Sequence, residues 1–114
     1  MRANTYVIDL RHYLDEDGDL ADLPGPALTL ARTFTSVVAW VTAYPAADGL
    51  PITNVWCWRR PGRQRCRGEL AAELRDSEIV FECPMCGVNG VIRGWEHSLW
   101  DRRPGTTDDT FPAA

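Results

Sequence analysis

Lysine is absent from this chain of 114 residues, so its basic charge comes entirely from 12 arginines. The 16 acidic residues outnumber them and give a net charge of −4. The overall charge therefore does not predict nucleic-acid binding, which depends on neutralising phosphates with basic side chains. The use of arginine alone, together with abundant alanine, is more typical of a GC-rich genome than of a mechanism.

Long hydrophobic runs are also missing from the chain. No stretch of about 18 uncharged apolar residues occurs, which excludes a membrane-spanning helix. Near the start of the chain, Asp9 and Arg11 interrupt the apolar core that a secretory signal needs. We therefore expect a cytoplasmic protein without a membrane partner. In that reducing compartment, cysteines serve as metal ligands more often than as disulfides.

Residues that typically build an active site are scarce as well. The chain has 2 histidines and shows neither a Ser-His-Asp order nor a phosphate-binding glycine loop. His12 has no partner pattern, and His97, after the last cysteine, is either an alternative metal ligand or an isolated hydrogen-bonded side chain. The sequence therefore predicts a binding protein rather than an enzyme, and a metal or thiol enzyme is the remote alternative.

The composition, with 45% apolar and 25% charged residues, is typical of a globular protein. The length of 114 residues predicts one domain and leaves room for at most one further small module. Apolar residues at three- and four-residue steps predict an amphipathic helix over residues 26–44. Pro24 and Pro26 suit its first turn, and Pro45 ends it. The apolar stripe consists of Ala27, Leu30, Ala31, Phe34, Val37, Val38, Val41 and Tyr44.

Alternation of apolar and polar residues predicts short strands on both sides of this helix. Before the helix, residues 5–10 are expected to be extended. Residues 15–19 are expected to form a solvated acidic turn, because the position of Gly18 does not fit a calcium-binding loop. After the helix, we expect strands over residues 52–57, 69–74, 78–83 and 91–93, of which the middle two form a hairpin.

Four cysteines lie in the second half of the chain, at Cys57, Cys66, Cys83 and Cys86. The Cys83-Pro-Met-Cys86-Gly run predicts a tight turn that presents two thiolates, and the hairpin brings the first pair alongside. Four thiolates complete a tetrahedral site, so we predict one structural Zn²⁺, in a ligand set that also suits iron. Four buried thiols or a Cys57–Cys66 disulfide are the alternatives. A redox-active Cys83/Cys86 pair is disfavoured, because the residues after it do not form the helix that lowers a thiol pKa.

A family resemblance rests on the same residues. The run Cys83-Pro-Met-Cys-Gly-Val-Asn-Gly-Val-Ile-Arg-Gly-Trp95, followed by Trp100-Asp101, resembles small, mostly uncharacterised bacterial zinc-ribbon proteins. The Arg-Pro-Gly-Arg-x-x-Cys-x-Gly run over residues 60–68 and the Leu-Pro-Gly-Pro-Ala run before the helix are similar too. The resemblance implies a four-cysteine ribbon preceded by a helix, and it implies no activity. Val88 departs from it, because that group often has an acidic residue after the turn.

These patterns together predict an α+β fold, in which an N-terminal amphipathic helix packs with a small antiparallel β zinc ribbon. Residues 1–48 are expected to hold the first strand, the acidic turn and the helix, and residues 49–101 the zinc ribbon. Residues 102–114, rich in proline, glycine, threonine and aspartate, are expected to form a mobile tail.

An arginine cluster lies between the first two cysteines. It consists of Arg59, Arg60, Arg63, Arg65 and Arg67, within nine residues that contain no acid. If Cys57 and Cys66 share a metal, this loop projects from the site, and Trp58 and Trp56 beside it offer a surface for stacking bases. We therefore predict binding of single-stranded nucleic acid. The loop can instead offset the charge of the metal centre, pair with the acidic first half of the chain, or bind another protein.

The outer face of the predicted helix carries few charges. It consists of Thr29, Arg32, Thr35, Ser36, Ala39 and Ala43, with Trp40 on its flank. Solvent-exposed helix faces usually carry more charged side chains, so we expect this face to be covered. The cover is either the tryptophan-bearing C-terminal segment or a second copy of the chain, and Trp40 is the predicted interface residue of such a homodimer.

Overall fold

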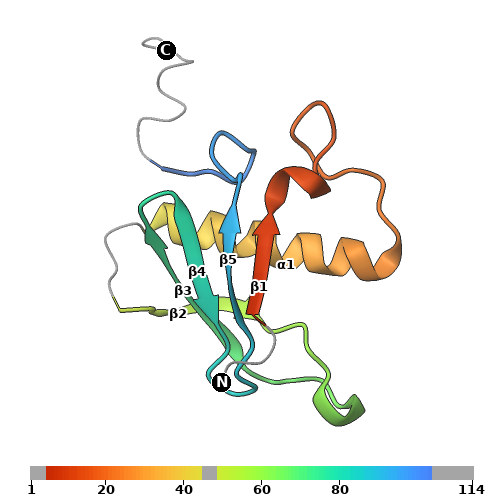
Figure 1. The fold of residues 1–114 in the computed structure, drawn as a ribbon, viewed down its shortest axis with the longest axis vertical. Coiled ribbons are helices and arrows are strands. Elements are labelled where there is room, and N and C mark those ends of the chain that lie inside the picture. Colours follow the sequence, from red (N-terminus) through yellow and green to blue (C-terminus); the bar gives the residue numbers. More distant parts are fainter. Residues whose placement is uncertain (1–4, 45–48, 104–114) are drawn as a thin grey trace.

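The computed structural model describes residues 5–44 and 49–103, which form one α-helix, five β-strands and two short 3-10 helices (Figure 1). In chain order these are β1 (Thr5–Asp9), η1 (Leu10–Tyr13), α1 (Gly25–Ala43), β2 (Ile52–Trp56), η2 (Pro61–Arg63), β3 (Glu69–Arg75), β4 (Glu78–Glu82) and β5 (Asn89–Arg93). The predicted α+β class is confirmed, and every predicted helix and strand overlaps an observed one.

All five described strands belong to one sheet, with the order β1-β5-β4-β3-β2. The predicted hairpin is confirmed, because β3 and β4 pair in an antiparallel register that places Ala72 opposite Phe81. The β4–β5 and β2–β3 pairs are also antiparallel, whereas β1 pairs with β5 in parallel. The segment before the helix therefore contributes an edge strand to the sheet formed by the segment after it.

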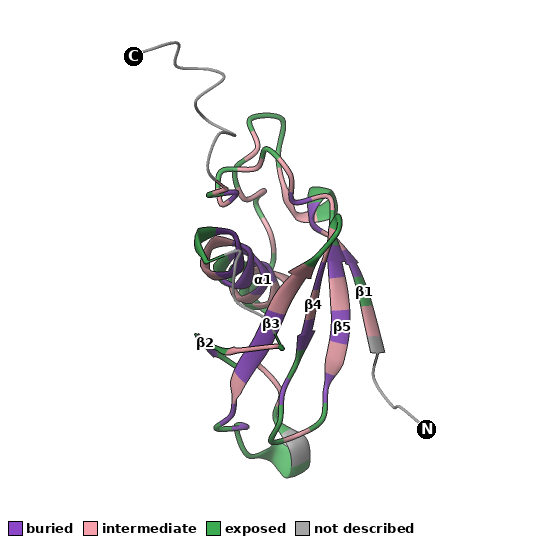
Figure 2. Cartoon of the chain, turned by 90° about the vertical axis from the view of Figure 1, so that its left-hand side faces the viewer, coloured by how far each residue is buried: buried purple, intermediate pink, exposed green. Residues whose placement is uncertain are grey.

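Helix α1 lies across one face of the sheet (Figure 2) and contacts β2 and β3. The predicted apolar stripe supplies its buried side, because Phe34, Val37 and Val38 are inaccessible to solvent. The ring of Phe34 packs 5.8 Å from that of Phe81 in β4, which joins the helix to the middle of the sheet. Tyr44, the last predicted member of the stripe, is exposed, because it follows the end of the helix.

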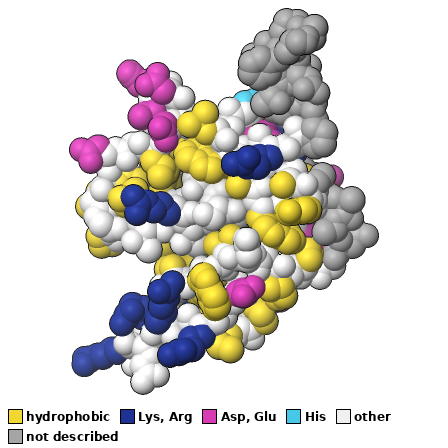
Figure 3. All heavy atoms as spheres, turned by 180° about the vertical axis from the view of Figure 1, so that it is seen from behind, with side chains coloured by type: hydrophobic (Ala, Val, Ile, Leu, Met, Phe, Trp, Pro, Cys, Tyr) yellow, Lys and Arg dark blue, Asp and Glu magenta, His cyan; other side chains and the backbone are white. Residues whose placement is uncertain are grey.

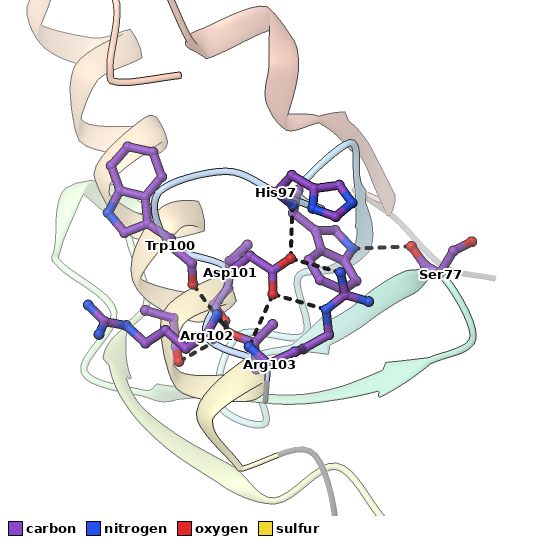
Figure 4. A network of polar contacts seen from close by, with 10 residues as sticks. Ser77, His97, Trp100, Asp101, Arg102 and Arg103 are labelled. Atoms are coloured by element: carbon purple, nitrogen blue, oxygen red, sulfur yellow. Dashed lines mark hydrogen bonds and ion pairs between the residues drawn. The ribbon is translucent and has the colours of Figure 1, made fainter. Parts of the chain in front are cut away.

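The segment after β5 is attached to the C-terminal turn of α1 (Figure 4). Thr42 is fully buried, and its Oγ1 accepts the N–H of Arg102 at 2.8 Å and lies 3.2 Å from the carbonyl oxygen of Trp100. Thr35, on the predicted outer face, is buried as well. The C-terminal segment thus contacts the end of the helix at Thr42. Four residues of the predicted outer face, Thr29, Arg32, Ser36 and Ala43, are nevertheless exposed, so the expected cover over that face is not formed within the described residues.

The same segment is organised around Asp101, whose side chain is completely buried. Its carboxylate accepts the N–H of His97 at 2.8 Å and hydrogen bonds from the guanidinium of Arg103 at 2.8 and 2.9 Å. Burial by itself raises the pKa of this carboxyl, but the bonds from Arg103 and His97 outweigh burial and leave the pKa below its ordinary value. The Arg103 guanidinium also lies 4.6 Å from the ring of Trp95, whose indole N–H donates to the carbonyl of Ser77 at 3.1 Å.

The predicted mobile tail therefore begins inside the described fold, since Arg102 and Arg103 are bonded to α1 and to Asp101. The rest of that tail, residues 104–114, lies outside the described residues. No helix in the described part of the chain combines the length and the apolar character needed to cross a membrane.

Candidate metal centre

The four cysteines come together at one end of the sheet. Cys57 directly follows β2 and Cys83 directly follows β4, while Cys66 lies shortly before β3 and Cys86 shortly before β5. Because neighbouring strands here are antiparallel, the ends of β2 and β4 lie beside the starts of β3 and β5. The fold therefore gathers all four predicted ligands, and their Sγ atoms lie within 4.8 Å of one another.

The spacing of the sulfurs fits a tetrahedral metal site. The Sγ atoms of Cys57 and Cys86 are 3.7 Å apart, and those of Cys66 and Cys83 are 3.6 Å apart. Four sulfurs at a Zn–S distance of about 2.3 Å form a tetrahedron with edges of about 3.8 Å, close to both separations. All four cysteines are free, so the alternative Cys57–Cys66 disulfide is not formed. The cluster can hold a metal ion.

Backbone amides support the sulfurs of the first pair. The N–H of Arg59 points at the Sγ of Cys57, and the N–H of Gly68 points at the Sγ of Cys66, each at 3.4 Å. The N–H of Cys66 in turn donates to the carbonyl of Arg59 at 2.8 Å, which closes the arginine loop at its base. Hydrogen bonds of this kind favour the charged form of a sulfur ligand.

Two glycines shape the site. Gly87 donates its N–H to the carbonyl of Cys83 at 2.8 Å, and its φ of +85° is one that glycine adopts without strain, as the predicted turn requires. Gly68 leaves room for the sulfurs, because a Cβ atom there would lie 2.6 Å from the Sγ of Cys83 and 2.9 Å from the Cβ of Met85. Gly68 is a site residue that was not predicted from the sequence, although its position two residues after Cys66 is a pattern that could have indicated it.

Burial favours the neutral form of the thiols. Cys57 has no solvent exposure, and its burial, reinforced by the neighbouring sulfurs of Cys83 and Cys86, raises the pKa of its thiol. The hydrogen bond from the N–H of Arg59 offsets only part of this effect. An isolated thiolate is therefore costly at this position, and a bound cation would compensate for that cost.

The arginine loop, residues 59–67, projects from the end of the molecule that holds the cysteines (Figure 1). Arg60, Arg63, Arg65 and Arg67 are exposed. No carboxylate forms an ion pair with any arginine of the loop among the described residues, although ion pairs occur elsewhere. Those pairs are Arg11–Asp9, Arg75–Glu73, Arg93–Glu78 and Arg103–Asp101.

The acidic turn does not neutralise this loop. The Oδ1 atom of Asp15 accepts the N–H groups of Asp17 and Asp19 at 2.8 and 3.1 Å, so the turn is closed on itself. On the face seen in Figure 3, most acidic side chains gather near the upper end and the largest group of basic side chains lies at the lower end, with one acidic side chain near it. Internal pairing between the loop and the acidic first half, one of the predicted alternatives, is therefore not formed within the described residues.

Trp58 and Arg59 are half-buried and contact other parts of the fold. The ring of Trp58 packs against those of Tyr6, Phe34 and Phe81 at centroid distances of 5.5, 5.4 and 6.0 Å. Arg59 donates from its Nη1 to the hydroxyl of Tyr6 at 3.3 Å. Trp58 is thus half-buried against the core, held by contacts from three distant parts of the chain, and its role as a nucleic-acid-binding residue stays a prediction.

Trp56 is the tryptophan that accompanies the exposed arginines. It is the last residue of β2, it is 53% exposed, and it lines a hollow of about 700 Å³. The other residues that line this hollow are Arg60, Arg63, Gln64, Arg65, Cys66 and Arg67. The structure therefore combines one aromatic surface with four exposed arginines that form no ion pair with a described carboxylate, beside the cysteine cluster.

Two other predicted candidates lie away from this centre. His97 is exposed and is not part of the cysteine cluster, so the structure does not bring it to the metal site as an alternative ligand. Trp40 is half-buried in α1 and packs against Tyr44, with ring centroids 5.0 Å apart. Its role as a dimer interface stays a prediction.

No known family model, curated protein or solved structure matches this chain. The resemblance to small bacterial zinc-ribbon proteins therefore stays a prediction, and the function has to be argued from the site itself. The fold and the site together define an α+β protein with a four-cysteine cluster that can hold a metal ion.

Proposed function

We propose that the chain is a structural-zinc module of the zinc-ribbon kind, in which Cys57, Cys66, Cys83 and Cys86 bind one Zn²⁺. The observation that carries this proposal is the gathering of all four Sγ atoms within 4.8 Å from the ends of four strands. Four protein ligands fill a tetrahedral zinc site and leave no position for a water or a substrate, which favours a structural metal over an enzyme. Free thiols are also what a reducing compartment such as the cytoplasm maintains.

We further propose that the arginine loop binds nucleic acid through its phosphates. Cys57 lies two residues before the loop and Cys66 lies next to its last residue, so a bound metal would fix the base from which the arginines project. A Zn²⁺ ion with four thiolates carries a formal charge of about −2, which is less than the positive charge of the five arginines in the loop. The charge of the metal centre therefore offsets only part of the positive charge of the arginine loop. The remaining positive charge suits a polyanion as the ligand of the loop.

The dependence of affinity on salt tests this proposal. Each phosphate that is neutralised on a single strand contributes about −0.7 to the slope of log affinity against log salt, so three or four engaged arginines predict a slope of about −2 to −3. Replacing Arg60, Arg63 and Arg65 with alanine should flatten the slope and leave the zinc content unchanged, because none of them is a ligand. If no oligonucleotide, single-stranded or duplex, binds the zinc-loaded protein at low salt, the nucleic-acid function is wrong.

A protein partner is the second candidate function, and the open face of the sheet favours it. Val7, Val91 and Val80 are aligned across β1, β5 and β4, and by strand alternation they lie on the face opposite to α1. Val7 is 66% exposed, and no described element covers this row. In this case glutamate substitution of Val7 should abolish partner binding, whereas the arginine substitutions should not.

A further inference from the structure

The arginine loop separates two hollows that lie beside the cysteine cluster. The first, of about 700 Å³, has Trp56 on its wall, and the second, of about 460 Å³, has Met85 on its wall. Gln64, Arg65, Cys66 and Arg67 line both hollows, and this shared wall, which carries two exposed arginines, is the ridge between them. Trp56 is 53% exposed and Met85 is 68% exposed, so each hollow presents an apolar surface next to the same two cations.

We infer that this ridge binds single-stranded nucleic acid, with Arg65 and Arg67 contacting the phosphates while one base stacks on Trp56 and a neighbouring base packs on Met85. This inference rests on the proposed function and adds to it the two side chains, Trp56 and Met85, that contact the bases of an unpaired strand. It follows from the placement of exposed Trp56 and Met85 in hollows that share two arginines, since a single strand offers bases for apolar surfaces and phosphates for cations.

The exposed indole is what distinguishes a single strand from a duplex. Phosphates are accessible in both, so arginines alone bind either one. The flat faces of the bases are stacked on one another inside a duplex and become available to an aromatic side chain only when the strand is unpaired. A surface that pairs Trp56 with Arg65 is therefore better suited to unpaired bases than to a duplex.

Both apolar surfaces are held in place by the fold. Trp56 is in register with Glu69 of β3, so the sheet fixes its position. Met85 lies in the turn between Cys83 and Cys86, so the metal ligands on either side of it fix its position.

The test compares labelled single-stranded and duplex oligonucleotides of equal length, titrated at fixed low salt with the zinc-loaded full chain. The wild type should prefer the single strand. Trp56→Ala should weaken single-strand binding by about tenfold with an unchanged salt slope, in keeping with the known effect of removing one stacking aromatic. Trp56→Phe should retain most of the affinity, and Met85→Ala should weaken it several-fold.

Matched controls separate stacking from general effects of substitution. Ile52→Ala removes another exposed apolar residue from β2, 51% exposed and outside both hollows, and should leave binding unchanged. Arg32→Ala removes an exposed arginine from α1 and should also be neutral, whereas Arg65→Ala should reduce the salt slope by about 0.7. Zinc content and far-UV circular dichroism of each variant show whether it has folded.

Three outcomes overturn the inference in distinguishable ways. If Trp56→Ala and Met85→Ala bind as tightly as the wild type while Arg65→Ala does not, the proposed phosphate binding stands and the base contacts are wrong. If Trp56→Ala weakens duplex and single-strand binding equally, Trp56 does not read unpaired bases. If neither oligonucleotide binds at low salt, the proposed nucleic-acid function fails together with the inference.

Discussion

The Sγ atoms of Cys66 and Cys83 lie 3.6 Å apart, although 17 positions separate the two residues in the chain. Cys66 precedes β3 and Cys83 follows β4, and the antiparallel pairing of these strands brings both to one end of the hairpin. Gly68 makes the approach possible, because a Cβ atom at this glycine would lie 2.6 Å from the Sγ of Cys83 and 3.5 Å from that of Cys66. The hairpin and one glycine thus create half of the candidate metal centre.

Substitution of Gly68 should therefore damage the metal centre. Gly68→Ala is expected to destabilise the zinc-loaded protein by about 1–3 kcal/mol, the usual cost of forcing extra volume into a packed site. It should also weaken zinc binding in competition with a chromophoric chelator. Gly25→Ala is the control, because a Cβ atom at Gly25 meets nothing within 4 Å. Equal zinc affinity in the two variants would show that Gly68 does not shape the site.

Removal of zinc should unfold the sheet end that carries the cysteines. Structural zinc contributes an apparent binding free energy of about 10–16 kcal/mol, as much as the whole stability of a typical domain, about 5–15 kcal/mol. Adding a chelator should therefore shift the amide resonances of residues 66–95. Part of α1 should survive as helix in circular dichroism, although a helix of this kind depends on packing. Unchanged amide shifts after the metal has been removed would contradict this role.

The cysteine turn and the hairpin could be predicted from the sequence because both are encoded by local patterns, a short Cys-x-x-Cys spacing and alternation over adjacent strands. The parallel pairing of β1 with β5 could not be predicted from the sequence. It places Thr5 opposite Asn89, which is distant in the chain, and it depends on the packing of the whole sheet. The roles of the two tryptophans show the same contrast. Alternation along β2 places Trp56 outward, whereas the burial of Trp58 depends on Tyr6 and Phe34, which no local pattern connects to it.

Asp101 should stabilise the attachment of the C-terminal segment. Asp101→Asn is expected to lower the free energy of unfolding by about 2 kcal/mol, because the buried carboxylate loses charge-assisted bonds with Arg103. Asp22→Asn, at an exposed position, is the control. Thermal unfolding of the three proteins measures the difference, and an Asp101→Asn variant as stable as the control would contradict this assignment.

The effect of Asp101 should also depend on pH. The pKa of its carboxyl is lower in the folded state than the ordinary value of 3.8, so the ionised form favours folding. The contribution is complete above about pH 4 and is lost as the pH falls through the folded-state pKa. The stability difference between wild type and Asp101→Asn should therefore be constant near neutral pH and shrink in acid. A difference that grows in acid would contradict the sign of this linkage.

Self-association through α1 is expected to depend on Trp40. Trp40→Glu should weaken a homodimer by at least about tenfold, because it places a charge in an apolar contact surface. Val7→Glu, on the opposite face of the sheet, is the matched control and should leave the dimer intact. Sedimentation of the three proteins over a range of concentrations provides the measurement. A wild-type monomer at the highest concentration would exclude the helix-mediated dimer.

The central claim is that four cysteines bind one zinc ion, and metal analysis of freshly purified protein tests it most directly. The account predicts one zinc per chain, with the thiols of Cys57, Cys66, Cys83 and Cys86 unreactive until a chelator removes the metal. Cys83→Ser should reduce the zinc content sharply, whereas Arg60→Ala should leave it unchanged. One iron ion per chain would support the four-cysteine metal site but contradict zinc as its metal. Less than half a zinc per chain in metal-replete protein, with all four thiols reacting freely, would contradict the account itself.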